Sequence, residues 1–379
     1  MSLVRFPVRR PVGLPVRSVL GGVFAFSPDQ VSGTQAFYDP SDLTSLYQSR
    51  TGGSIVSADG QTVGIMLDKS QMGGKTAAAF IAGAEASGTE VGDTFGVGGA
   101  TPTSVGGVWS LAKEASGTWT QSVLITLTGW YAVTFTVTEL STPGAGAVYV
   151  RDGFSNDSGV GANGTYTRVS NLLSGFRVFP AVGGTSCKIQ INSCKALPGH
   201  HALAPSDAAR PLYKTAGGLH WLQPDGTDDF KQVSPTLDLG ETWWHVGGWK
   251  ATSGRAFTTT SWYQNAIRAT GSRWIWYNDA GAQTSVSTSD PVSANVTTIE
   301  KASNASLSLR FNGVGEVSAI NPFDETGVAG LALFTQGNGS YAGGLNGRFY
   351  GGTFGTGTLS PSDRAKLEAY TAAKTGVTL

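Results

Sequence analysis

The clearest alternation of apolar and polar residues lies in the middle of the chain. In residues 131–137, YAVTFTV, a tyrosine, two valines and a phenylalanine share one face of an extended segment, while alanine and threonine share the other. This period of two is typical of a strand with one buried face. Several such segments, separated by glycine-rich turns, fall between residues 86 and 196 and predict a β-sandwich.

A second set of strand-like segments runs from about residue 197 almost to the end, for example WWHV at 243–246 and RWIWY at 273–277. Together with residues 23–84 it predicts another sandwich. The interpretation is an all-β fold of two jelly-roll-type sandwiches: 85–196 is inserted into a sandwich made of 23–84 and 197–379.

The last segment has a different pattern, which predicts a helix over residues 360–375. Ser360 and Pro361 form an N-terminal capping sequence, and Gly376 is a typical stop signal. We expect one ion pair at i,i+4 spacing and one apolar stripe on its surface. The pair is Arg364 with Glu368, and the stripe consists of Leu367, Tyr370 and Ala373.

Composition agrees with many short strands and tight turns. The chain has 379 residues, of which 53 are glycine, and only 14% are charged. The 26 basic residues balance the 26 acidic ones, so nothing indicates a nucleic-acid partner. A weakly charged surface favours association with neighbours. No stretch reaches the roughly 18 apolar residues of a membrane span, and the proline-broken start does not resemble a signal peptide.

Residues 1–22 have no pattern that buries a face. Three prolines at a spacing of four favour extended backbone, and arginine provides the only charges. One interpretation is a floppy terminus. The other is an arm that docks on another subunit through its arginines. These are Arg5, Arg9, Arg10 and Arg17.

The tryptophans are the main candidates for ligand binding, because an exposed indole face stacks on sugar rings. The same side chain also fills sandwich cores. Trp243 and Trp244 are adjacent on one strand and must face opposite sides, so at most one of them enters the core of this sheet. The candidates are Trp221, Trp243, Trp244, Trp262, Trp274 and Trp276.

Other chemical signals are weak. Asp225, Asp228 and Asp229 offer oxygen ligands for Ca²⁺, but a turn whose carboxylates accept backbone N–H bonds is favoured. His200 and His201 lack the spacing of a metal motif. Cys187 and Cys194 are interpreted as two reduced thiols: on one strand they would point to opposite faces, and a bridge would need a turn between them. No metal and no cofactor is predicted.

Three segments carry a resemblance to a known family: residues 38–70, residues 198–230 with HALAPSDAARPLYK and PDGTDDF, and the close at 347–379. They resemble bacteriophage virion proteins with a concanavalin A-like (laminin-G-like) sandwich. The inserted region, with GTYTRVS at 164–170, resembles a carbohydrate-binding-module sandwich. Trp221 departs from the family's usual apolar residue and Phe before Asp-Gly, which puts the local strand edge in doubt.

The resemblance implies a structural component of a phage particle (fibre, baseplate or capsid decoration) located in the virion. It would bind other virion proteins through its N-terminal arm, form a homo-oligomer, with a trimer as first guess, and contact host-surface glycans. It implies no reaction, no nucleic acid and no membrane insertion. Two alternatives stay open: a ligand-free cement protein and a polysaccharide-degrading virion enzyme.

Overall fold

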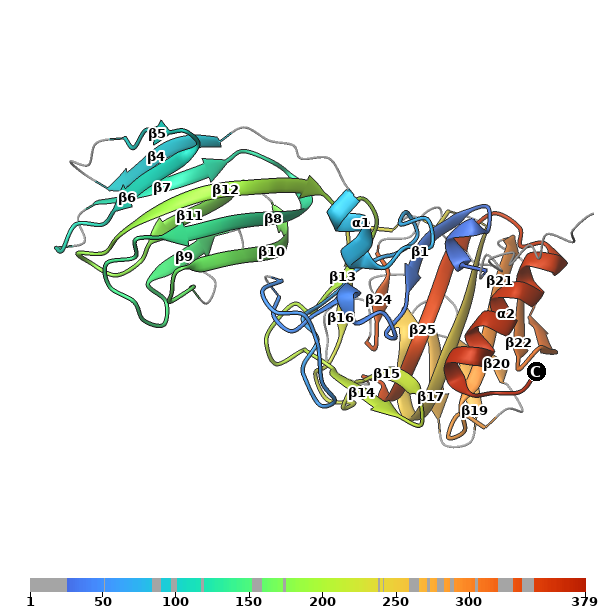
Figure 1. Cartoon of the computed structure of the whole chain (residues 1–379). Coiled ribbons are helices and arrows are strands. Elements are labelled where there is room, and N and C mark those ends of the chain that lie inside the picture. The colour runs from blue at the N-terminus through green and yellow to red at the C-terminus, as the bar shows by residue number, and fades with distance from the viewer. Residues whose placement is uncertain are drawn as a thin grey trace, which may run out of the picture.

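The protein consists of two β-rich lobes that lie side by side in the computed structural model (Figure 1). We call the strands within residues 90–196 the small lobe, and residues 26–83 with 197–379 the large lobe. The residues described are 26–50, 52–83, 90–96, 101–116, 119–151, 159–172, 175–237, 239–240, 242–258, 266–270, 273–277, 283–286, 290–303, 306–319, 330–335 and 344–379.

The large lobe is a curled antiparallel sandwich centred on the long strand β17, Trp243–Thr258. The first half of β17 pairs with β25 and β21, and its last residues pair with β18 and β24. The strand β17 therefore belongs to two groups of strands, and residues of both groups form one common hydrophobic core.

The strands around the first half of β17 are β1 (Thr34–Tyr38), β14 (Leu212–Ala216), β15 (Leu219–Gln223), β21 (Asn295–Ser303), β22 (Ser306–Phe311), β23 (Val314–Ala319) and β25 (Asn346–Thr356). The others are β2 (Leu46–Tyr47), β3 (Ile65–Met66), β13 (His201–Leu203), β16 (Lys231–Ser234), β18 (Ala266–Thr270), β19 (Arg273–Tyr277), β20 (Gln283–Val286) and β24 (Ala332–Leu333). Short helices are η1 (Pro28–Gln30), η2 (Leu43–Ser45) and α1 (Ala77–Gly83).

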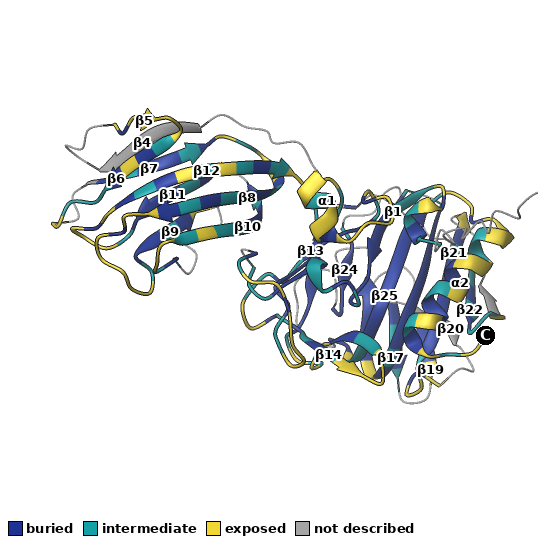
Figure 2. Ribbon diagram, in the orientation of Figure 1, coloured by how far each residue is buried: buried dark blue, intermediate teal, exposed yellow. Residues whose placement is uncertain are grey.

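Helix α2, Pro361–Thr375, covers the outer face of β17, β21 and β25. The predicted helix is confirmed with its caps: Ser360 Oγ accepts the Asp363 N–H, and Gly376 takes a left-handed conformation. Because α2 buries that face, the first seven residues of β17, 243–249, are all buried, whereas Thr252 and Ser253 further along the strand are exposed. Figure 2 shows the buried residues of this sheet in dark blue beneath α2. None of the described helices has the length and apolar character needed to cross a bilayer.

The surface of α2 differs from the predicted one. Arg364 pairs with Glu300 on β21, and Glu368 accepts from Arg310 on β22, so the i,i+4 partners bind the sheet instead of each other. Ala373 is exposed. The buried stripe is Leu367, Glu368, Thr371, Ala372 and Thr375. Leu367 is common to the predicted and the observed stripe, Tyr370 is partly buried, and the sheet beneath supplies partners for Glu368 that the helical pattern does not contain.

The small lobe packs two antiparallel sheets against each other. Its alternation in β8 is confirmed, because Val133, Phe135 and Val137 enter the core while Thr134 and Thr136 face outward. The five-stranded sheet contains β5 (Ser104–Val105), β6 (Val108–Ala112), β8 (Gly129–Thr138), β10 (Gly164–Leu172) and β12 (Ser186–Ala196); the four-stranded sheet contains β4 (Glu90–Gly96), β7 (Trp119–Ile125), β9 (Val148–Arg151) and β11 (Phe176–Pro180).

A β-bulge decides the place of the two cysteines. Both lie on β12, whose register shifts between Ile191 and Ser193, so one extra residue restores the face. Cys187 and Cys194 therefore both enter the small-lobe core, where the sequence predicted opposite faces. They are free thiols, and about 20 Å of continuous strand separates them, whereas a disulfide needs Cα atoms closer than about 7 Å.

Both thiols are expected to be unreactive in the folded protein. Burial raises the pKa of Cys187 and of Cys194 to about 12, which suppresses the nucleophilic thiolate at neutral pH. Titration with a thiol reagent should count no thiol in buffer and two in urea, without any reductant. A count of zero in urea would mean that the cysteines are oxidised and would contradict the structure.

Candidate functional site

Four of the six candidate tryptophans are buried in the large lobe. Trp243 enters the main core and Trp244 lies under α2, which confirms that the two adjacent rings face opposite sides. A ring without an exposed face has no surface on which a sugar can stack, so none of these four is an exposed stacking platform. They are Trp221, Trp243, Trp244 and Trp274, each at most 5% exposed. Trp262 and the side chain of Trp276 lie outside the described residues, and their role stays a prediction.

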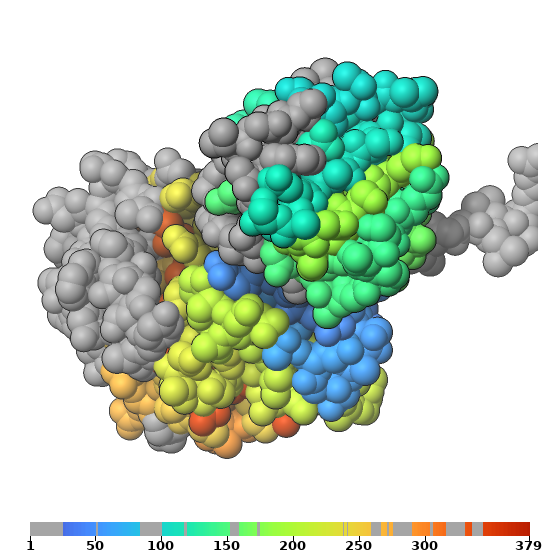
Figure 3. All heavy atoms as spheres, turned by 90° about the vertical axis from the view of Figure 1, so that its left-hand side faces the viewer, coloured from blue at the N-terminus to red at the C-terminus, as the bar shows by residue number. Residues whose placement is uncertain are grey.

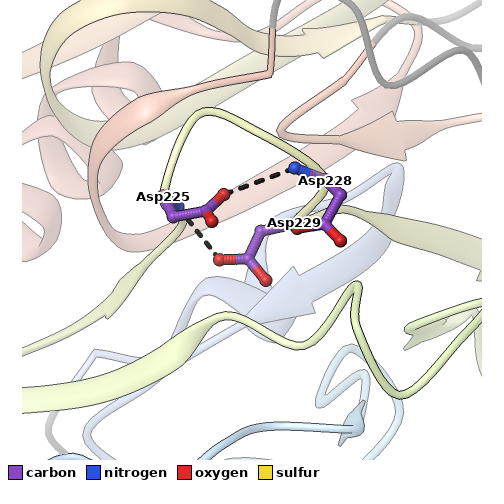
Figure 4. Close-up of side chains that lie close together, drawn as sticks. All are labelled: Asp225, Asp228 and Asp229. Atoms are coloured by element: carbon purple, nitrogen blue, oxygen red, sulfur yellow. Dashed lines mark hydrogen bonds between the residues drawn. The ribbon is translucent and has the colours of Figure 1, made fainter.

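The three aspartates after β15 form a closed turn (Figure 4). Asp225 Oδ1 accepts the N–H groups of Thr227 and Asp228 at 2.7 and 3.4 Å, and the Asp225 N–H donates to Asp229 Oδ2 at 2.9 Å. Burial and the neighbouring carboxylates raise the pKa of Asp229 to about 6, although the Asp225 N–H opposes this. The carboxyl oxygens of Asp225, Asp228 and Asp229 lie within 4.8 Å of one another. The carboxylates of Asp225 and Asp229 accept backbone N–H groups, which confirms the turn that the sequence favoured.

The histidine pair is not arranged as a metal site. His201 is fully buried; its Nδ1 accepts the Asp68 N–H at 2.9 Å, and its Nε2 lies 3.2 Å from the Leu197 carbonyl. Burial lowers the pKa of His201 to about 4, so the ring is neutral with both nitrogens engaged. Asp207, six residues after His201, does not complete such a site, because its carboxylate is exposed and lies 3.6 Å from Arg210 Nε.

The contact between the lobes is built around Trp130 of β8. Its Nε1 donates to the Ser234 carbonyl at 2.9 Å, and its ring meets His201 edge-on at 4.9 Å between centroids. Asn171 of β10 also donates to Ser234 Oγ. Apolar residues of both lobes close the contact: Tyr47, Ile65, Leu67, Met72, Ala77, Ala132, Val169 and Leu197. Figure 3 shows the green strands of the small lobe seated on blue and yellow-green segments of the large lobe.

Beyond this contact, the outward face of the five-stranded sheet is polar. Thr134 and Thr136 of β8 lie opposite Thr167 and Thr165 of β10, with hydroxyl oxygens 3.0 and 2.9 Å apart. Thr136 also donates to the side-chain carbonyl of Asn192 at 2.9 Å. We call the set Thr134, Thr136, Thr165, Thr167, Gln190 and Asn192 the hydroxyl–amide face. It is partly or fully exposed and carries neutral groups that donate and accept hydrogen bonds.

Sequence reasoning did not select the hydroxyl–amide face. Its signal was present, because the polar half of the alternation in YAVTFTV and in GTYTRVS supplies the four threonines. The predicted ligand-binding residues were all tryptophans, and these threonines were not among them. The arm residues Arg5, Arg9, Arg10 and Arg17 lie outside the described residues, so the docking arm stays a prediction.

Comparison with known proteins finds likeness in solved structures alone. No protein-family model matches the chain, and no curated protein matches it. The CBM40 module of the Ruminococcus gnavus IT-sialidase bound to α2,3-sialyllactose is 17% identical, with 40% of this chain and 95% of that chain covered at a TM-score of 0.28. Mouse laminin α1 domains LG4-5 are 9% identical, with 70% and 94% covered at 0.29.

An arabinofuranosidase complexed with arabinofuranosyl-α-1,2-xylobiose is 12% identical, with 66% of this chain and 63% of that chain covered at a TM-score of 0.36. At these identities and scores, the likenesses carry no argument about a ligand or a reaction. The fold itself, antiparallel sandwiches closed by a C-terminal helix, is established by the strands and their pairing.

Proposed function

We propose that this protein binds carbohydrate without cleaving it, and that the hydroxyl–amide face of the small lobe makes the contact. The observation that supports the proposal is the row of neutral hydroxyl and amide groups across β8, β10 and β12. Sugar hydroxyls need partners that both donate and accept, and these side chains do both. The large lobe covers the apolar end of the same sheet through Trp130, Ala132 and Val169, which leaves the polar end to solvent.

The charged neighbours of the face favour a neutral sugar. Lys188 of β12 is neutralised by Glu139 at 2.6 Å. Lys195 donates to the Ala82 carbonyl of α1 at 2.9 Å, and so its ammonium is directed to the lobe contact. Among the described residues, the two lysines beside this face therefore have partners, and a face of neutral groups has little attraction for a polyanion but retains hydrogen-bonding capacity.

Removing one hydroxyl from the face should weaken sugar binding without unfolding the lobe. Thr136→Val and Thr165→Val keep the side-chain shape, and each is expected to raise the dissociation constant of a neutral oligosaccharide about three- to tenfold. The measurement is a screen of immobilised neutral glycans followed by calorimetric titration of the best binder.

The matched control is Thr215→Val, an exposed threonine of β14 on the large lobe, which should leave the affinity unchanged. A screen without any binder would favour the ligand-free cement protein. The appearance of new reducing ends during incubation with polysaccharide would favour the degrading enzyme instead.

The virion role belongs to the same proposal and rests on the sequence resemblance. In this role the arginine-bearing arm attaches the protein to other virion proteins, the two lobes point outward, and the copies form a homo-oligomer. Deletion of residues 1–22 should then abolish incorporation into particles while the sugar affinity of the purified protein stays the same. Incorporation of the truncated protein at the normal level would refute the docking arm.

A further inference from the structure

Two cations of the large lobe face each other, and no carboxylate among the described residues pairs with either. Lys250 of β17 lies directly opposite Arg348 of β25, and both are half-buried. Like charges placed directly opposite in a sheet destabilise it. Among the residues that the structure describes, no acidic side chain forms an ion pair with either, whereas Lys374, Arg364 and Arg310 on the same side of the sheet are all paired.

The guanidinium of Arg348 is held in a defined orientation. It stacks over the Trp221 ring of β15 with 4.2 Å between Cζ and the ring centroid. Its only described hydrogen bond is a long one, 3.4 Å from Nη1 to the Tyr350 hydroxyl. An arginine has five N–H donors, so most of those on Arg348 have no partner among the described residues. Arg348 precedes Phe349, the residue of β25 that pairs with Leu222 of β15, and Figure 1 shows β15 beside the sheet that contains β25 and β17.

Asp225, which lies near the start of β25, does not neutralise Lys250 or Arg348. Asp225 bridges to Asn346, two residues before Arg348, but its carboxylate accepts backbone N–H groups of its own turn. Keeping two like charges side by side costs stability in every unliganded molecule. A ligand oxyanion would remove that cost, and an arginine stacked on an indole is ready to bind one through two parallel bonds.

We propose that Arg348, Lys250 and Trp221 form a second binding site, on the large lobe, for a sugar ring that carries a carboxylate or a sulfate. Arg348 binds the oxyanion of the sugar, and Lys250 supplies the second positive charge. The Trp221 ring fixes the plane of the Arg348 guanidinium. Two cations match one acidic group and are too few for the regular phosphate spacing of a nucleic acid. The site is separate from the hydroxyl–amide face, which lies on the other lobe.

Binding is tested on the whole chain by calorimetric titration with three probes: an oligogalacturonate, a heparin-derived oligosaccharide and a neutral oligosaccharide of equal length. We expect one acidic probe or both to bind, which separates carboxylate from sulfate. Arg348→Gln and Lys250→Gln should each raise the dissociation constant about tenfold or more. Lys250→Gln does not touch the Trp221 stack, so it tests the site even if Arg348→Gln perturbs the fold.

The control variant is Lys366→Gln, which removes the same charge from an exposed lysine of α2. It should keep the wild-type affinity. Equal weakening by all three variants would mean non-specific charge attraction and would overturn the site, as would the failure of both acidic probes to bind. Equally tight binding of a random-sequence DNA would mean that Lys250 and Arg348 do not select an acidic sugar, and would also overturn the proposal. Loss of neutral-sugar binding at the hydroxyl–amide face has no bearing on these outcomes.

Discussion

Acidification from pH 7 to pH 4 should destabilise the wild-type protein by about 3 kcal/mol more than a His245→Gln variant. His245 is fully buried in β17. Its Nδ1 lies 3.1 Å from the Thr353 carbonyl, and its Nε2 accepts the indole N–H of Trp249 at 3.2 Å. These partners assign the proton to Nδ1. A second proton would set two N–H groups against each other.

The direction of this effect follows from the pKa. Burial lowers the pKa of His245 to about 3, and the bond to Thr353 opposes that shift only in part. An unfolded histidine titrates near 6.5, so between pH 6.5 and about 3 the unfolded chain binds the extra proton. The stability contributed by the neutral ring is complete above pH 6.5 and falls as the pH falls through this window.

Two carboxyl groups act in the opposite direction and make the variant comparison necessary. Burial raises the pKa of Asp68 and of Asp229 to about 6. The folded state therefore binds more protons than the unfolded chain between pH 6 and about 4, and these groups gain stability on acidification. Their effect is the same in wild type and His245→Gln, and it cancels in the difference.

The measurement is urea unfolding at several pH values, followed by tryptophan fluorescence. His220→Gln, at a half-exposed position of β15, controls for the loss of an imidazole as such. Parallel stability curves for the wild type and His245→Gln would contradict the buried neutral histidine.

Trp130→Ala is expected to uncouple the two lobes and to cost about 3–5 kcal/mol of stability. The indole is 4% exposed and contacts His201 while it donates to Ser234. Removal leaves a cavity in the centre of the contact and takes the indole donor away from the partly buried Ser234 carbonyl. Because Trp130 is the side chain of the small lobe that contacts both His201 and Ser234, we expect each lobe to unfold in its own transition once the indole is lost.

Calorimetry and limited proteolysis measure this uncoupling. Trp130→Phe keeps an aromatic ring against His201 but loses the bond to Ser234, so we expect a smaller loss of about 1 kcal/mol and unchanged coupling. Trp109→Ala removes a buried indole from the small-lobe core, away from the junction, and should destabilise that lobe alone. A Trp130→Ala protein that unfolds like the wild type would refute the role of the junction.

Several structural features could be predicted from the sequence because the residues that determine them lie within a few positions of one another. The cap of α2 needs Ser360, Asp363 and Gly376, which the chain places at the correct spacing. The alternation in β8 identifies its buried face, since successive side chains of a strand point to opposite sides. The same rule separated Trp243 from Trp244. The acid turn followed from its own backbone N–H groups.

Other features depend on partners that are distant in the sequence. Arg364 was expected to bind Glu368, but Glu300 approaches from β21 and its partly buried carboxylate binds it instead. Strand parity put the cysteines on opposite faces, and a bulge that only the pairing with β8 reveals reversed the result. No local sequence pattern indicated which tryptophan rings would be covered by other parts of the fold.

The sequence by itself determined the all-β class, the terminal helix with its ends and the inward face of the alternating strand β8, because these depend on local backbone geometry and on a period of two or 3.6. Tertiary structure decided which outward faces are covered. Helix α2 buries Trp244, the large lobe buries Trp130, and Arg348 covers Trp221. The threonines of the small lobe, by contrast, stay open to solvent. A side chain becomes core or surface according to what packs over it, and that contact is made by residues up to hundreds of positions away.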